Sequence, residues 1–136
     1  MKIKIFALTH KKFEVPQDKM YQPLQVGREE KEDLGYLCDN TGDNISAENC
    51  YYSELTGLYW IWKNVHTYKY VGTCHYRRYL LNEQEKIFTE AEYLELLKDY
   101  DLITTKRVVL NNSYHYGFAT NHNIHALDMT GEVIKE

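Results

Sequence analysis

The segment His75-Tyr76-Arg77-Arg78-Tyr79 places two adjacent arginines among aromatic residues that carry polar groups. Guanidinium groups bind phosphate through charge-assisted hydrogen bonds, and they also stack on aromatic rings. The segment predicts a site where Arg77 and Arg78 neutralise a diphosphate, His75 supports them, and Tyr76 and Tyr79 line the ligand. An alternative stays open, because in an extended segment the two arginines point to opposite sides and only pair with acidic surface groups.

Further polar residues are candidates for the same site because they follow a predicted strand, lie among turn formers or belong to the first predicted helix. They are Thr9, His10 and Lys11 after the first apolar run, Asp43 and Asn44 in a stretch of turn formers, and Glu54. Asp43 and Asn44 suit a ribose or sugar hydroxyl, but they equally suit an Asx-type turn. Glu54 either faces the site or only completes the first turn of a helix.

The sequence predicts neither a metal site nor a bound cofactor. Cys38, Cys50 and Cys74 form no C-x-x-C pair, and only His122 and His125 are close histidines without a nearby cysteine. The motifs G-x-S-x-G, G-x-G-x-x-G, the P-loop and H-E-x-x-H are absent, so a nucleotide hydrolase or phosphotransferase ranks last among the function classes. The three cysteines do not suit a disulfide framework, which favours location of the protein in the reducing cytoplasm.

Alternating apolar segments predict the elements that position these residues. Buried strands are expected at 2–9, 68–74 and 101–105, and helices at 51–65, capped by Asn49 or Ser53, and from Thr89 to near Asp99. Strands that alternate with helices predict an α/β fold, a mostly parallel sheet with flanking helices, in which ligands bind beyond the carboxyl ends of the strands. Residues 13–49 are expected to be mostly loop, and Asp128 or Thr130 to start a last short helix.

Length and composition bound the class of protein. The 136 residues suit one domain, and a net charge of −4 argues against a nucleic-acid partner. No run approaches the roughly twenty apolar residues that span a bilayer, so any membrane association is expected to be peripheral.

Five blocks in order resemble an uncharacterised bacterial domain family of capsular and exopolysaccharide gene clusters, considered to be glycosyltransferases and often fused to family 2 type transferases. The blocks are KIFALTHKK, YQPLQVG, LGYLCDNTGDNIS, ELTGLYWIWKN and YVGTCHYRRYL. The resemblance covers essentially the whole chain, yet the family domain is longer. The chain, residues 1–136, is therefore expected to be a single domain corresponding to the N-terminal portion of a glycosyltransferase-like domain.

This resemblance implies a partial A-type nucleotide-sugar transferase fold, Rossmann-like, with Thr9, His10 and Lys11 beside the nucleotide. By a further structural analogy, many A-type transferases carry an Asp-x-Asp metal motif where this chain has the arginine segment. Cationic side chains would then replace the metal in offsetting charge on the leaving diphosphate. The expected substrates are a nucleotide sugar and a saccharide acceptor, at the cytoplasmic face of the membrane.

A non-catalytic reading stays open. A truncated or accessory module would bind a nucleotide or a partner transferase, such as one of family 2 type, and turn nothing over. If later elements normally cover the helix at 51–65, the chain should expose an apolar patch and form a homodimer.

Overall fold

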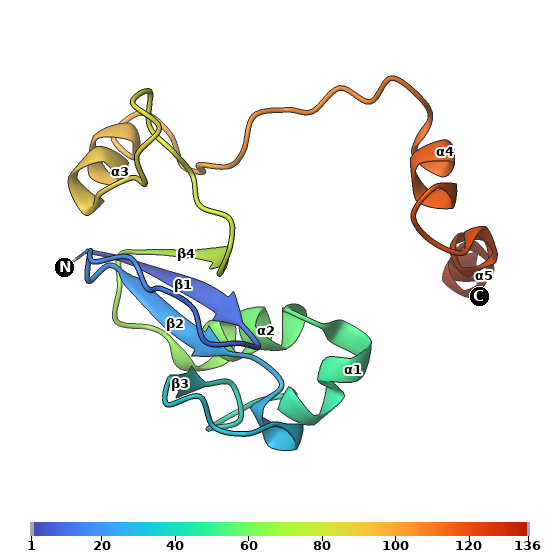
Figure 1. Cartoon of the computed structure of the whole chain (residues 1–136), viewed down its shortest axis with the longest axis horizontal. Helices are drawn as coiled ribbons and strands as arrows, with labels where there is room; N and C mark the ends of the chain where they lie inside the picture. The colour runs from blue at the N-terminus through green and yellow to red at the C-terminus, as the bar shows by residue number, and fades with distance from the viewer. Residues whose placement is uncertain (1, 136) are drawn as a thin grey trace. The chain divides into compact units, whose positions relative to one another are not determined.

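The computed structural model describes residues 2–135 (Figure 1). The chain divides into two compact units, one up to Thr104 and one from Thr105 onward. Every residue of the predicted site lies in the first unit, and each unit is described by itself below.

A parallel sheet forms the centre of the first unit. Within residues 2–135 its four strands are β1 (Ile3–Thr9), β2 (Tyr21–Gln25), β3 (Leu37–Cys38) and β4 (Tyr70–His75), in the order β3-β2-β1-β4. All the pairings are parallel, and β1 lies between β2 and β4 with all seven of its residues buried. The predicted α/β fold with a parallel sheet is confirmed. The carboxyl ends of all the strands therefore meet at one edge, called the carboxyl edge below.

Both faces of the sheet are covered, as the apolar composition of β1 requires. On one face, α2 (Leu55–Asn64) packs Trp60 and Ile61 against the sheet residues Phe6, Leu8, Leu24 and Val26. Gly57 allows this close approach, because a Cβ there would lie 2.6 Å from Val26 Cγ1. On the other face, α3 (Glu90–Leu96) contributes Tyr93 to a core with Ile3, Ile5, Met20 and Tyr21.

The helix predicted at 51–65 is interrupted. α1 (Asn49–Tyr52) ends at Ser53, whose φ of 52° breaks the helical path before α2 begins. Neither helix has a side-chain cap, so the caps predicted at Asn49 and Ser53 are wrong. The start of α3 is confirmed, because Thr89 and Glu92 form a capping box there, although the helix ends at Leu96 rather than near Asp99.

The strand predicted at 101–105 is wrong, because these residues form no strand. Residues 13–49 are mostly loop, as predicted, but they also hold β2, β3 and the short 3-10 helices Arg28–Glu30 and Ser46–Glu48, which the sequence pattern did not predict. Pro23 hid β2 from the sequence pattern, since proline lacks the ladder donor. The backbone of the odd-numbered β2 residues is directed at β3, because Gln25 O accepts from Asp39 N. Since β3 pairs only with Leu24 and Gln25, there is no β3 residue opposite Pro23, and its missing N–H costs no ladder hydrogen bond.

The second unit consists of α4 (Tyr114–Ala119) and α5 (Ile124–Lys135). α5 begins before Asp128 and Thr130, which lie inside the helix, so the start predicted at these residues is wrong. Asn123 Oδ1 instead accepts from His125 N at 3.1 Å. Among the helices of residues 2–135, none is both long and apolar enough to cross a membrane.

Candidate functional site

Tyr76 is the centre of a cluster at the carboxyl edge of β1 and β4. Its N–H donates to Leu8 O at 3.1 Å, and the residue is 8% exposed. Its ring lies 5.5 Å from the His10 ring and 4.4 Å from the His75 ring, centroid to centroid, and the Arg77 guanidinium lies 5.1 Å from its centroid. Residues that follow two different strands therefore meet around one aromatic ring, as the parallel topology predicts.

The turn after β1 is shaped by Thr9. Its hydroxyl accepts from Lys11 N at 3.0 Å and donates to Lys11 O at 2.5 Å, and the residue is 1% exposed. Thr9 is thus committed to the backbone of the turn, an ST-type motif. Its contribution to the cluster is to present His10 and Lys11, which are both exposed.

The turn after β4 is equally tight. His75 O accepts from Arg78 N at 2.8 Å, and His75 Nδ1 accepts from Arg77 N at 3.2 Å. Glu54 Oε1 lies 3.9 Å from His75 Nε2, which brings the carboxylate at the start of α2 to the same place. Glu54 therefore faces the cluster, one of the two alternatives that the sequence left open.

The cluster is electropositive. Partial burial of the His10 ring lowers its pKa, and the charges of Lys11, Lys31, His75 and Arg77 lower it further. Cations that disfavour a proton on His10 favour an anionic ligand at the same place. Aromatic faces beside these charges suit a ligand that combines phosphates with a ring.

The remaining predicted site residues make no described contact with the Tyr76 ring. Tyr79 packs edge-on against Tyr21 with 5.5 Å between ring centroids, its hydroxyl donates to Tyr76 O, and burial raises its pKa to about 12. Arg78 is exposed beyond the turn. Asp43 contacts Tyr59 Oη at 3.1 Å near the far end of α2, so the structure does not bring it to Tyr76.

Asn44 makes the contacts of a turn residue. Its Oδ1 accepts from Ser46 N at 3.1 Å, and its Nδ2 donates to Gly42 O at 3.0 Å. This is the Asx-type arrangement that the sequence left open as an alternative to sugar binding.

Asp39, which the sequence shows only as one of a run of turn formers, is the centre of a second polar cluster. The residue is fully buried, and its carboxylate accepts four hydrogen bonds from three segments. The donors are Gly27 N at 2.8 Å, Arg28 N at 3.1 Å, Ser46 Oγ at 2.6 Å and Thr56 Oγ1 at 2.7 Å. Such complete pairing satisfies a buried charge, so Asp39 joins the residues after β2 to the start of α2.

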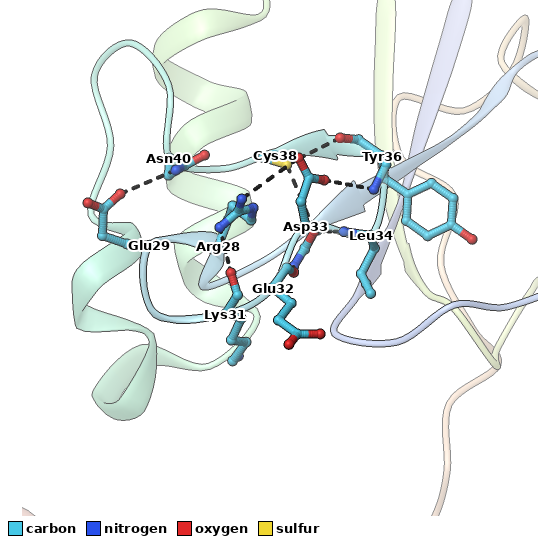
Figure 2. Close-up of polar contacts among 11 residues, drawn as sticks. Arg28, Glu29, Lys31, Glu32, Asp33, Leu34, Tyr36, Cys38 and Asn40 are labelled. Carbon is cyan, nitrogen blue, oxygen red and sulfur yellow. Dashed lines mark hydrogen bonds and ion pairs between the residues drawn. The ribbon is translucent and has the colours of Figure 1, made fainter.

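The loop after β2 is closed by Arg28. Figure 2 shows Arg28 directed at the carbonyl oxygen of Lys31 and at Asp33, whose carboxylate lies 3.7 Å from the guanidinium. Asn40 Nδ2 donates to Glu29 at 3.2 Å in the same view. These contacts hold residues 28–33 in one conformation beside the carboxyl edge.

Part of α2 is apolar and exposed. Leu55, Leu58 and Trp62 are each about half or more exposed and line a groove with Ile45 and Tyr59. This is the kind of apolar patch expected on the helix predicted at 51–65. Within residues 2–135, the structure groups no three His, Cys, Asp or Glu side chains in the manner of metal ligands.

Comparison with known proteins identifies the family. A family described as a domain of unknown function, DUF4422, matches residues 4–136, and the chain belongs to this family. The fold is also similar to the apo structure of WbbM, a bifunctional glycosyltransferase, with a TM-score of 0.55 and 42% sequence identity. That similarity covers 59% of this chain and 14% of WbbM. No curated protein shows significant sequence similarity to the chain.

Proposed function

We propose that this domain takes part in transferring a glycosyl group from a nucleotide sugar to a saccharide acceptor, in capsular or exopolysaccharide synthesis. The observation that carries the proposal is the cluster around Tyr76, where cations from two strand ends surround aromatic rings. The 42% identity to part of a bifunctional glycosyltransferase supports the same class of chemistry. The resemblance to families of polysaccharide gene clusters supplies the pathway context.

In this proposal Arg77 and Arg78 bind the diphosphate and offset the negative charge that grows on it as the sugar leaves. Lys11 adds positive charge and His75 supports the arginines, while the Tyr76 ring packs against His10, His75 and Arg77 beside the nucleotide. Cationic side chains then do the work that a divalent metal does in other transferases. The reaction is expected to proceed without a metal.

Thr9 supports the site through the turn after β1, and Tyr79 supports it through its hydrogen bond to Tyr76 O. His10 contacts the nucleotide. Asp43 and Asn44 take no part in this proposal, because Asp43 lies near the far end of α2 and Asn44 makes the contacts of a turn residue.

The proposal places the domain in the cytoplasm, at the inner face of the membrane, beside a family 2 type transferase. The exposed groove formed by Leu55, Leu58 and Trp62 with its neighbours gives a surface for that partner or for a second copy of the chain. Sedimentation at high concentration tests the second copy, since a monomer would contradict a homodimer.

A non-catalytic module that binds a nucleotide or a partner is the second candidate. The observation that favours it is that the similarity to the bifunctional glycosyltransferase covers 14% of that protein, so the chain corresponds to a small part of it. Assays of donor turnover, with an acceptor present and absent, distinguish the two candidates, because only a transferase turns over the donor.

The test is a thermal-shift panel of UDP, GDP, CMP and dTDP sugars, with and without EDTA. A ligand that binds only the native state raises Tm by mass action, so no acceptor is needed. We expect one nucleotide class to raise Tm, EDTA to leave the shift unchanged, and Arg77→Ala and Arg78→Ala to reduce it. Arg107→Ala, an exposed arginine of the second unit, is the matched control. A panel without any shift would contradict the proposal.

A further inference from the structure

Lys31 carries a cation to the carboxyl edge from a segment that the sequence pattern did not connect with the site. Its Nζ lies 3.5 Å from the carbonyl oxygen of Val26, the residue that follows β2. Val26 N in turn donates to Thr9 O at 2.9 Å, directly before His10 in the chain. The Lys31 ammonium is therefore beside the end of β1, and it is close enough to His10 to lower the pKa of that ring.

The position of this ammonium is fixed by Asn49. Asn49 Oδ1 accepts from Lys31 Nζ at 2.9 Å, while Asn49 Nδ2 donates to Thr56 Oγ1 at 3.0 Å. Thr56 donates to the buried Asp39, so a chain of hydrogen bonds runs from a fully buried carboxylate to the exposed lysine. Gly27 makes room for it, because a Cβ at this position would lie 2.4 Å from Asn49 Cγ.

The backbone of Lys31 is fixed separately. Arg28 Nη1 donates to Lys31 O, and Figure 2 shows the lysine side chain extending away from that contact. Both oxygens that Lys31 Nζ contacts belong to neutral groups, a peptide carbonyl and an amide. These contacts orient the ammonium without cancelling its charge, as a phosphate-binding lysine requires.

We propose that Lys31 is a phosphate-binding residue of this site, and that its ammonium, held by Asn49 and the Val26 carbonyl, contacts the diphosphate of the donor together with Arg77. The inference deepens the proposed function and rests on it. It assigns the diphosphate to the space between the ends of β1, β2 and β4. The loop after β2 thereby becomes part of the ligand site.

The test uses inorganic pyrophosphate as the probe, in calorimetric titrations of the whole chain at low salt. Lys31→Gln removes the charge and retains a polar side chain, and Lys31→Ala removes both. Loss of one charge-assisted contact is expected to weaken pyrophosphate binding by at least about tenfold. Lys86→Gln, with the same change of charge on an exposed lysine of the 81–87 loop, is expected to bind like the wild type. Because Lys31 is exposed, Tm is expected to stay unchanged in all three variants.

The outcomes separate this inference from the proposed function. If Lys31→Gln binds pyrophosphate as tightly as the wild type while Arg77→Ala binds it weakly, the inference is overturned and the proposed function stands. If binding depends on Lys31 but no nucleotide sugar of the panel competes, the phosphate-binding role of Lys31 is supported, and the assignment of that phosphate to a nucleotide-sugar donor is contradicted together with the proposed function. A wild-type chain that binds no pyrophosphate overturns the inference, and the nucleotide-sugar panel then decides the proposed function independently.

Discussion

Two polar clusters lie side by side at the same edge of the sheet, and they treat charge in opposite ways. Around Asp39, a buried carboxylate is paired with four donors from three segments. Around Tyr76, the Arg77 guanidinium lies 5.1 Å from the ring centroid, and Lys11 and Lys31 are close enough to lower the pKa of His10. The carboxylate described there is that of Glu54, 3.9 Å from His75 Nε2.

The difference separates stability from binding. A buried charge with every hydrogen bond satisfied contributes when the chain folds, and breaking it is costly. Exposed like charges contribute little to folding and repel one another, so their arrangement is favourable only when an anion joins them. The cluster around Asp39 therefore stabilises the fold at this edge of the sheet, and the cluster around Tyr76 is suited to binding an anion there.

The largest effect is expected from Asp39→Ala. The substitution leaves two backbone N–H groups and two hydroxyls buried without their acceptor, which should lower the free energy of unfolding by about 4 kcal/mol. Urea denaturation of the variant measures this loss. Asp33→Ala is the matched control, because Asp33 pairs with Arg28 at 3.7 Å with its side chain 60% exposed. Its loss should stay below about 1 kcal/mol, and equal losses in the two variants would contradict the distinction between the clusters.

The second-largest effect is expected from Gly27→Ala. This substitution displaces Asn49, whose hydrogen bonds connect the Asp39 cluster, through Thr56, with Lys31. Gly27 has a φ of 64°, and an added Cβ would overlap Asn49. The left-handed conformation and the overlap together should cost about 2 to 3 kcal/mol in urea denaturation. Displacement of Asn49 should also weaken pyrophosphate binding, because Lys31 loses its anchor.

Gly35→Ala isolates the steric part of that effect. Gly35 has a similar φ of 75°, but a Cβ there would meet nothing within 4 Å. The substitution should cost only about 1 kcal/mol and leave pyrophosphate binding unchanged. If the two glycine variants behave alike, the contact with Asn49 does not connect the clusters.

These clusters differ in how far the sequence reveals them. The parallel sheet follows from apolar runs that alternate with a helix, and its topology alone brings His10 and Lys11 towards Tyr76 and Arg77. Residue types at strand ends were therefore sufficient to predict the core of the second cluster. The role of the arginine pair was less accessible, because residues 75–78 form a tight turn rather than the extended segment that the sequence alternative assumed.

Asp39 and Lys31 lay beyond sequence reasoning for a physical reason. Both depend on β2 and β3, which are short, interrupted by Pro23 and without a periodic apolar pattern. The hydrogen-bond partners of their side chains come from positions 5 to 18 residues away along an irregular path, and only the folded chain brings these together. Local patterns correctly identified turn formers here but could not show that one of them is fully buried.

The smallest expected effect is the pH dependence of pyrophosphate binding, and it tests the electropositive cluster around Tyr76. Burial and neighbouring cations lower the pKa of His10 from its ordinary value of 6.5, so the ring is mostly neutral at pH 7 in the free protein. A diphosphate beside the ring favours the imidazolium and raises that pKa, so binding takes up a proton. The affinity for pyrophosphate should rise a few-fold as the pH falls from about 8 to about 6.

His10→Gln provides the comparison for this effect, because the titration of pyrophosphate itself is the same for both proteins. The ratio of the two Kd values should therefore change with pH only through His10, and a constant ratio would remove His10 from the ligand site. Folding responds in the opposite direction. Below pH 6.5 the unfolded chain binds more protons at His10 than the native state does, so the contribution of His10 to the free energy of unfolding falls as the pH falls. A fall in pH should thus lower the contribution of His10 to the free energy of unfolding and raise the affinity for pyrophosphate. Opposite responses of this kind are expected of a cationic cluster that becomes favourable only when an anion binds.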